Sequence, residues 1–220
     1  MRVLLFGATG TVGGAVLAAC LESPVVQQVA TLARRPLGRS HPKLRERKHS
    51  AFTDFAPVMD SFAGVDACLF CLGVSVTRVP GEADYRRITQ DYALAAADAL
   101  RVASPRAAFH YVSGRSTNAR GRLMWARVKG ETELALMERV GAVCWRPAFV
   151  DAPPGASAPP YLRLLQPVGR LFRPVRSLYV EGTDIGRAML QATLDGTRRR
   201  VFENAEIRDL ATRFGSSMAR

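Results

Sequence analysis

A glycine-rich turn near the start of the chain limits its possible folds more than any other feature. The turn, FGATGTVGG, follows the short apolar run 2–6 and leads into a segment whose apolar residues have helical spacing from Thr11 onward. Gly7, Gly10 and Gly13 have the spacing that lets a backbone approach a pyrophosphate held at a helix N-terminus. A tight turn without a ligand would not require all three glycines. The motif therefore predicts dinucleotide binding.

Strand-like and helix-like segments alternate through most of the chain. After the first strand, we expect strands at 25–33, 51–55, 67–72, 107–113 and 142–150, and helices from Thr11, around 88–99 and at 122–139. Strict alternation predicts parallel strands joined by crossover helices that cover both faces of the sheet. This is the doubly wound α/β plan, or Rossmann fold, and we expect a single domain over residues 1–220.

The pattern changes near residue 151. The sequence DAPPGASAPP is too rich in proline to extend a strand or helix far, so it predicts a loop leaving the sheet. The apolar and basic segment 161–174 is expected to form a broken helix over the carboxyl edge of the sheet. We therefore expect 151–180 to cover the substrate site. A further helix is expected from Thr183 or Asp184 to a stop at Gly196.

The chain is strongly basic, with 31 Lys+Arg against 19 Asp+Glu and a net charge of +12. Such a charge could serve a nucleic acid or an anionic membrane. However, Lys43, Lys48 and Lys129 are the only lysines, and an arginine-for-lysine bias also fits a GC-rich genome. No nucleic-acid-binding module is recognisable, so we do not favour such a partner and interpret most of the charge as compositional.

Neither the N-terminus nor the cysteines indicate a special compartment or metal site. No apolar stretch approaches the roughly 18 residues of a membrane span, and no signal-peptide pattern is present, so a soluble cytoplasmic protein is expected. Cys68 and Cys71 lie in a predicted strand, where positions three apart point to opposite faces. We therefore predict no metal site.

The end of the second predicted strand indicates which dinucleotide binds. A carboxylate about 20 residues after the glycines would bind the ribose 2′-hydroxyl of NAD, whereas arginine there accommodates the 2′-phosphate of NADP. This chain has Arg34 and Arg35 at that place and no acidic residue before Glu46. A guanidinium group suits a phosphate, so NADP (NADPH) is favoured and NAD is less favoured.

The chain resembles the atypical short-chain dehydrogenases/reductases in the segments FGATGTVGG, ARRP, CLFCLG, YRRITQDY, YVSG, VKGETE, WRPAFV and VFENAEIRDL. It is most similar to the Tat-interacting-protein oxidoreductase group, whose bacterial relatives include proteins like NAD-dependent epimerases/dehydratases. The resemblance covers almost the whole chain. The glycine motif is shared by the superfamily, whereas CLG, VKGExE and VxENxxIxDL are more specific. The resemblance implies an NADP(H)-dependent oxidoreductase acting on a small carbonyl or hydroxyl substrate.

The resemblance also implies site residues in this chain. Nucleotide contacts are implied for the glycine turn, the end of the second strand and the following loops: Gly7, Thr9, Gly10, Thr11, Val12, Gly13, Arg34, Arg35, Asp54, Phe55, Cys71, Leu72 and Gly73. Asp54 and Phe55 would lie beside the adenine. Further implied site residues are Ser113 at a strand end, Lys129 of a YxxxK motif, and the Arg146-Pro147 pair. For each of them, packing or simple solvent exposure is the alternative.

The chain departs from the family at the catalytic tyrosine, because the YxxxK position is Trp125. An indole N–H donates a hydrogen bond but has no usable acidity near neutral pH. Ser113 and Trp125 are then expected to position the substrate, while Lys129 holds the nicotinamide ribose. Tyr111 is expected in the core, and His110 on the opposite side of its strand from Ser113.

Two functions stay open at this stage. One is an NADP-dependent oxidoreductase of atypical mechanism. The other is a catalytically weak or inactive NADP(H)-binding sensor that acts through a protein partner. The resemblance permits a monomer or a homodimer, and the substrate is not evident.

Overall fold

The computed structural model of this 220-residue chain describes residues 1–151 and 169–218. They form a sheet of seven parallel strands in the order β3-β2-β1-β4-β5-β6-β9. The strands are β1 (Arg2–Phe6), β2 (Gln28–Ala33), β3 (Leu44–Lys48), β4 (Ala67–Phe70), β5 (Ala108–Val112), β6 (Val143–Arg146) and β9 (Val201–Glu203). A separate pair of short parallel strands consists of β7 (Phe149–Asp151) and β8 (Tyr179–Glu181).

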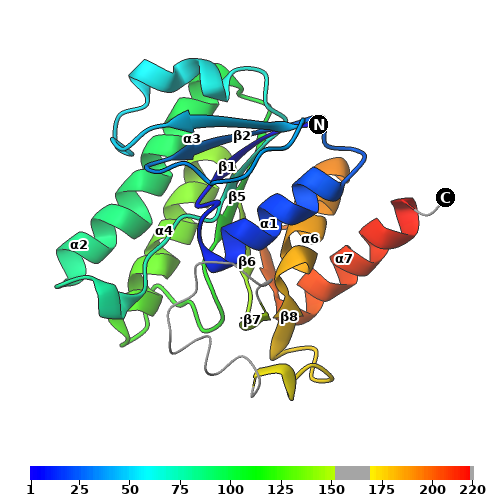
Figure 1. Ribbon diagram of the computed structural model, residues 1–220. Helices are drawn as coiled ribbons and strands as arrows, with labels where there is room; N and C mark the ends of the chain where they lie inside the picture. Colours follow the sequence, from blue (N-terminus) through cyan, green and yellow to red (C-terminus); the bar gives the residue numbers. More distant parts are fainter. Residues whose placement is uncertain (152–168, 219–220) are drawn as a thin grey trace.

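Helices cover both faces of the sheet (Figure 1). One face carries α1 (Thr11–Glu22), α6 (Gly182–Leu194) and α7 (Asn204–Met218). The other carries the 3₁₀ segment η1 (Ala56–Phe62), α3 (Tyr92–Ala103) and α4 (Met124–Val140). The short elements η2 (Val76–Arg78), α2 (Glu82–Arg86) and η3 (Arg87–Asp91) connect β4 to α3. The predicted doubly wound Rossmann fold is therefore confirmed. None of the helices in the described ranges has the length and apolar character needed to cross a membrane.

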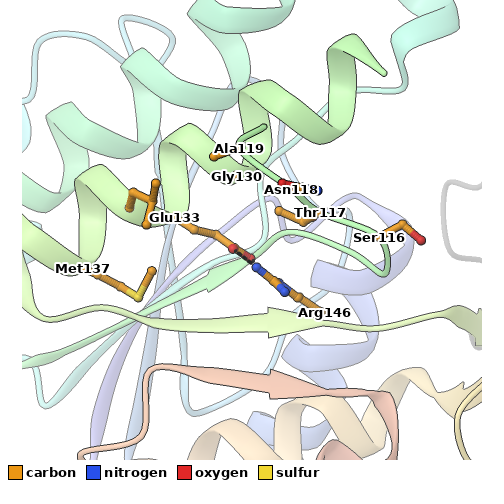
Figure 2. Close-up of a pocket in the computed structure, with 9 residues that line it drawn as sticks. Ser116, Thr117, Asn118, Ala119, Gly130, Glu133, Met137 and Arg146 are labelled. Atoms are coloured by element: carbon orange, nitrogen blue, oxygen red, sulfur yellow. Dashed lines mark hydrogen bonds and ion pairs between the residues drawn. The ribbon is translucent and has the colours of Figure 1, made fainter. Parts of the chain in front are cut away.

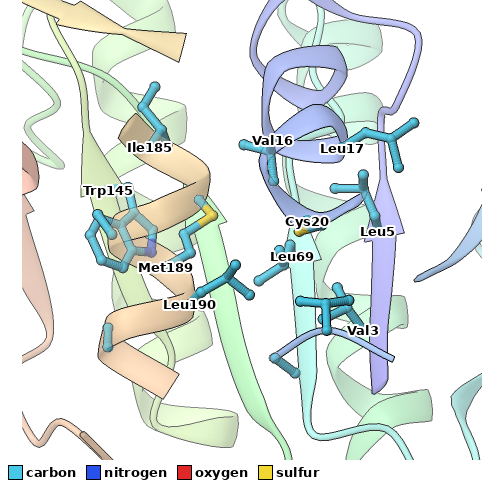
Figure 3. Packing of buried hydrophobic residues seen from close by; sticks show 14 of the residues in the cluster. Val3, Leu5, Val16, Leu17, Cys20, Leu69, Trp145, Ile185, Met189 and Leu190 are labelled. Carbon is cyan, nitrogen blue, oxygen red and sulfur yellow. The ribbon is translucent and has the colours of Figure 1, made fainter. Parts of the chain in front are cut away.

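The covering of β1 on both faces explains why its sequence is apolar from Val3 to Phe6, whereas Arg2 at its start is exposed. Val3 and Leu5 pack against the layer of α1 and α6, whereas Leu4 and Phe6 pack against the layer of η1 and α3. A parallel strand covered on both faces buries every side chain, so its sequence has no polar alternation. Figure 3 shows the first layer, where Val3 and Leu5 lie among apolar side chains of α1, β4 and α6.

The structure corrects the third predicted strand. Residues 51–55 form a turn, and the third strand is β3, with the sequence LRERK. β3 lies at the edge of the sheet and buries only Leu44, so it lacks an apolar pattern. Phe52 and Phe55 are nevertheless buried, because the turn itself packs on the core. The apolar side chains in 51–55 are therefore explained by burial of the turn, and they do not indicate a strand.

Other predicted boundaries are shifted. The strand expected at 25–33 begins only at Gln28, and the run 142–150 divides into β6 and β7 on either side of Pro147, which has no N–H for a sheet ladder. The helix that ends before Gly196 is confirmed, and this glycine has φ 55°, as a helix stop requires. Of the predicted broken helix, residues 161–168 lie outside the described residues, while 171–174 form a turn.

A buried series of hydrogen bonds joins the sheet to α6. The Trp145 indole N–H donates to His110 Nδ1 over 3.1 Å, and His110 Nε2 lies 2.9 Å from Thr193 Oγ1. Because an indole can only donate, the histidine proton must be on Nε2. Burial lowers the pKa of His110 from 6.5 to about 3. His110 is therefore a neutral core residue on the face of the sheet covered by α6, opposite the face where the Ser113 hydroxyl bonds α4.

This burial generates a prediction about acid stability. The unfolded chain protonates His110 below pH 6.5, whereas the folded chain resists protonation until about pH 3. His110 should therefore lower the free energy of unfolding by up to about 1.4 kcal/mol per pH unit as the pH falls through this window. Urea unfolding at several pH values measures the slope, and His110→Gln should have a smaller one. Equal slopes for the two proteins would contradict the prediction.

Candidate nucleotide-binding and active site

The glycine turn brings backbone against backbone at the carboxyl edge of the sheet. Gly7 has φ 78°, and a Cβ there would lie 2.6 Å from the carbonyl oxygen of Cys71, which follows β4. A Cβ at Gly13 would lie 2.1 Å from the carbonyl oxygen of Gly7. The Gly10 N–H donates to that same oxygen over 2.9 Å. Side chains at Gly7 or Gly13 would push α1 away from β1 and β4, so these glycines are required by the packing itself.

The N-terminus of α1 fits an anion. α1 begins at Thr11 after Gly10, and within the described chain no side chain caps its first turn and no acidic residue lies in it. The first N–H groups of a helix have no partner inside the helix, and its dipole favours negative charge there. Thr9 is exposed beside this turn, and Thr11 and Val12 are half-buried. The residues present therefore fit a dinucleotide pyrophosphate at this position.

Arg34 and Arg35 directly follow β2 and are exposed. β2 pairs in parallel with β1, so its carboxyl end lies beside the glycine turn. Among the residues that the structure describes, neither guanidinium group has an acidic partner. The first acidic residue after them, Glu46, accepts a hydrogen bond from the Leu37 N–H over 2.9 Å. The two arginines thus remain available to a ligand at the sheet edge.

The predicted contacts beyond the glycine turn have different environments. The Phe55 ring is buried and packs edge-on against Phe6 with 5.6 Å between ring centroids, so it belongs to the core. Asp54 is exposed and accepts a hydrogen bond from the Ala56 N–H. Cys71 and Leu72 are half-buried beside Gly7, whereas Gly73 is exposed, with open space where a side chain would be.

Ser113 directs its hydroxyl into a buried ion-pair network. The hydroxyl donates to Glu133 Oε1, with the Trp145 carbonyl oxygen 3.1 Å away as a second acceptor. Glu133 is only 1% exposed and receives two hydrogen bonds from Arg146, at 3.0 and 2.6 Å. Arg146 also bonds Glu203 at 3.1 Å, and Glu133 raises the pKa of its guanidinium. Ser113 therefore anchors β5 to α4.

A cavity of about 560 Å³ lies beside this ion pair. Figure 2 shows the Glu133 and Arg146 side chains, which line the cavity, directed toward one another, and the loop 116–119 and α4 supply the other lining residues. The loop packs directly on the helix, because a Cβ at Gly130 would lie 2.2 Å from the Ala119 nitrogen. The sequence-based analysis did not single out Glu133 or Glu203, although both lie in the family-like segments VKGETE and VFENAEIRDL.

Lys129 and Trp125 lie one helical turn apart on α4 and are both half-buried. The Lys129 ammonium donates to the carbonyl oxygen of Ser113, at the carboxyl end of β5. Burial lowers the pKa of Lys129 from 10.5 to about 8, and the charge of Glu133 opposes this shift. Within the described chain, Lys129 forms no ion pair. The structure thus brings Lys129 to the predicted edge and to the backbone of Ser113, but not to its hydroxyl.

The tyrosines that the structure describes pack on other rings or bond other groups, and Tyr92 packs against the Phe52 ring. Tyr111 is buried in the core as predicted, and burial raises its pKa well above the ordinary value. Tyr85 is also buried, and Tyr179 donates to Asp151 over 2.8 Å. Tyr161 lies outside the described residues. The described residues also contain no group of three or more metal-ligating side chains, and their four cysteines are free thiols.

No protein-family model matches this chain, and no curated protein matches its sequence. Solved structures do match its fold. The Bordetella bronchiseptica enzyme WbmF in complex with NAD+ has a TM-score of 0.68 and 16% identity, covering 99% of this chain and 78% of that chain. DesIV, a dTDP-glucose 4,6-dehydratase from Streptomyces venezuelae with NAD bound, has a TM-score of 0.68 and 16% identity, covering 100% and 81%.

A third match is an oxidoreductase of the short-chain dehydrogenase/reductase family from Burkholderia thailandensis, with a TM-score of 0.66 and 17% identity, covering 91% of this chain and 88% of that chain. At this level of identity the likeness establishes the fold. This chain has the Rossmann fold that these NAD-bound and short-chain dehydrogenase/reductase structures share.

The ion pair beside the cavity generates a stability prediction. Arg146→Met leaves the Glu133 carboxylate buried without its partner, which should cost about 3–5 kcal/mol of unfolding free energy. Glu203→Gln removes an exposed partner of the same arginine and should cost at most about 1 kcal/mol. Chemical denaturation of both variants measures the difference. Equal losses would show that burial of Glu133 does not control the pair.

Proposed function

We propose that this protein is an NADP(H)-dependent oxidoreductase of short-chain dehydrogenase/reductase type, acting on a small carbonyl or hydroxyl substrate. The observation that carries the proposal is the glycine turn, with the uncapped α1 N-terminus next to Arg34 and Arg35. The fold supports it, because similar structures hold NAD+ or NAD. Preference for NADP rests on the arginines alone.

Each part of the edge has a distinct task in this proposal. The first-turn N–H groups of α1 bind the pyrophosphate, and Arg34 and Arg35 bind the 2′-phosphate. Lys129 holds the ribose next to the nicotinamide, which supplies or accepts hydride when bound. Trp125 orients the substrate oxygen through its indole N–H or stacks on a ring. Ser113 acts through its carbonyl, which positions the Lys129 ammonium.

A second candidate function is a cofactor-binding sensor with little turnover. Two observations favour it. Trp125 replaces the family tyrosine, and the Ser113 hydroxyl is engaged by Glu133 instead of facing the edge. In this function, NADP(H) occupancy would control binding to a protein partner. Binding and turnover experiments separate the two functions.

Cofactor preference is tested by calorimetric titration with NADPH and NADH. We expect tighter binding of NADPH, because each charge-assisted bond to the 2′-phosphate contributes about 1.5–3 kcal/mol. Arg34→Ala with Arg35→Ala should lower the NADPH affinity at least about ten-fold and leave the NADH affinity nearly unchanged. Arg39→Ala, an exposed arginine in the same loop, is the matched control. Equal affinities for both nucleotides in the unmodified protein would contradict the NADP assignment.

Turnover is tested by offering saturating NADPH and a panel of aldehydes, ketones and quinones to the unmodified protein and to Trp125→Tyr. We expect slow NADPH oxidation by the former. The tyrosine variant should be faster by about 10²-fold or more, since it restores a general acid at the YxxxK position. If neither protein consumes NADPH while both bind it, the oxidoreductase proposal fails and the sensor function is favoured.

A further inference from the structure

We propose that Lys129 is itself the proton donor to the substrate oxygen during carbonyl reduction. This inference rests on the proposed oxidoreductase function and goes beyond holding the ribose, because it gives Lys129 the task of the absent tyrosine. Three observations support it: Lys129 lies at the carboxyl edge of the sheet, the neighbouring side chains are poor proton donors, and the charges nearby are paired with one another.

Topology brings Lys129 to the edge where the nucleotide site is expected. β5 ends at Val112, and the chain then turns back through α4, which begins at Met124. The first turns of α4 therefore lie at the carboxyl edge of the parallel sheet, where ligands bind in open α/β folds. The ammonium uses one N–H for the Ser113 carbonyl oxygen. An ammonium group has three N–H donors, so two remain for a ligand.

The neighbouring side chains cannot supply the proton. Trp125 has no usable acidity, and the Ser113 hydroxyl is bonded to Glu133. Burial raises the pKa of the Cys71 thiol, and Tyr111 bonds the Thr89 carbonyl oxygen inside the core. Lys129, in contrast, has an exchangeable proton and forms no ion pair within the described chain.

The charged side chains on the elements packed around Lys129 are paired with one another. On its own helix, Glu133 lies one turn away, and Arg146 of β6 neutralises it through two hydrogen bonds. The α2 residues Glu82 and Arg86 pair with Arg127 and Glu131 of α4. These two α4 residues lie about 160° around the helix from Lys129, so they face away from it.

This arrangement makes the ammonium a usable acid. Desolvation favours the neutral amine, and Glu133, the carboxylate that opposes this shift, is already paired with Arg146. The pKa of Lys129 accordingly lies near 8, close to physiological pH, which is the range in which a general acid is effective.

The proposed step balances without a further reactant. The carbonyl carbon accepts a hydride from the reduced nicotinamide, and the π electrons of the C=O bond move to its oxygen. That oxygen takes a proton from the Lys129 ammonium, giving the alcohol, oxidised nicotinamide and a neutral amine. The amine then regains a proton from solvent. In the reverse direction the neutral amine accepts the alcohol proton.

The pH dependence of turnover tests the proposal. With an aldehyde that the unmodified protein reduces, kcat should be constant at low pH and fall as the pH rises through about 8. Oxidation of the corresponding alcohol should rise through the same pH. Lys129→Arg keeps the positive charge that holds the ribose but does not release a proton. It should retain NADPH affinity within a few fold, lose about 10²–10⁴-fold in kcat, and lose the pH dependence.

Two controls separate acid chemistry from structure. Trp125→Phe removes the indole N–H and should keep the midpoint of the pH profile near 8, even where kcat changes. Lys48→Arg alters an exposed lysine and should leave both kcat and the profile unchanged. A Lys129→Arg variant with the kcat and pH profile of the unmodified protein would overturn the proposal.

A second measurement needs no turnover and uses the protein without nucleotide. The chain has only three lysines, so limited acetylation followed by mass spectrometry gives the reactivity of each against pH. Lys129 should become reactive with a midpoint near pH 8, well below the ordinary lysine value of 10.5. Restricted access lowers the rate at Lys129 without moving this midpoint. A Lys129 midpoint at the ordinary lysine value of 10.5 would overturn the proposal even if every variant failed to fold.

The outcomes also distinguish this inference from the function on which it rests. If the protein does not bind NADPH, or binds it and reduces none of the panel, the oxidoreductase function fails and the acid role fails with it. If the protein reduces an aldehyde but Lys129→Arg keeps full kcat, only the acid role fails. If the protein reduces an aldehyde with a kcat midpoint near pH 8, and Lys129→Arg loses both kcat and this pH dependence, the oxidoreductase function and the acid role are both supported.

Discussion

The close approach of backbone to backbone at the turn between β1 and α1 constrains the rest of the molecule. The peptide after Gly7 passes directly over the end of β4, and α1 begins so close to this turn that Gly13 touches the Gly7 carbonyl. Only residues without a Cβ allow this distance. Because α1 is held there, it can cover β1 on one side and pack against α6 on the other. The same approach leaves the first N–H groups of α1 facing outward at the sheet edge, so one packing constraint serves both the fold and the candidate binding site.

A second constraint acts on the other side of the sheet. Glu133 is a buried carboxylate, and burial of a charge is costly unless it is paired and hydrogen-bonded. Arg146 supplies the pairing, and the Ser113 hydroxyl supplies a further hydrogen bond. The network therefore connects the ends of β5 and β6 to the middle of α4, and it sets the position of the helix turn that carries Lys129. The Ser113 hydroxyl, which the resemblance implies belongs to the active site, bonds Glu133 and thereby holds the end of β5 to α4.

These two constraints give the candidate site an unusual distribution of chemistry. The nucleotide end is built from backbone groups and unpaired arginines, as in other Rossmann folds. The reacting end has an indole where an acid is expected, a hydroxyl turned into the core, and a desolvated lysine. In the proposed function, different groups therefore bind the cofactor and act on the substrate. Lys129 connects them in the proposed mechanism, because the ammonium held at the Ser113 carbonyl is assigned to both the ribose and the substrate oxygen.

The sequence alone determined the fold class, because glycine spacing and the alternation of apolar runs depend only on local geometry and burial. It also showed that Trp125 stands four residues before Lys129 and that two arginines follow β2. It did not locate β3, since an edge strand needs no apolar pattern, and the apolar turn at 51–55 imitated a strand. Only the tertiary structure decided where the Ser113 hydroxyl points and which residues share its network. Glu133, Arg146 and Glu203 are far apart in the chain, and their pairing depends on how β6, β9 and α4 pack. The physical reason is that side-chain direction and desolvation arise from long-range contacts, which no local pattern encodes.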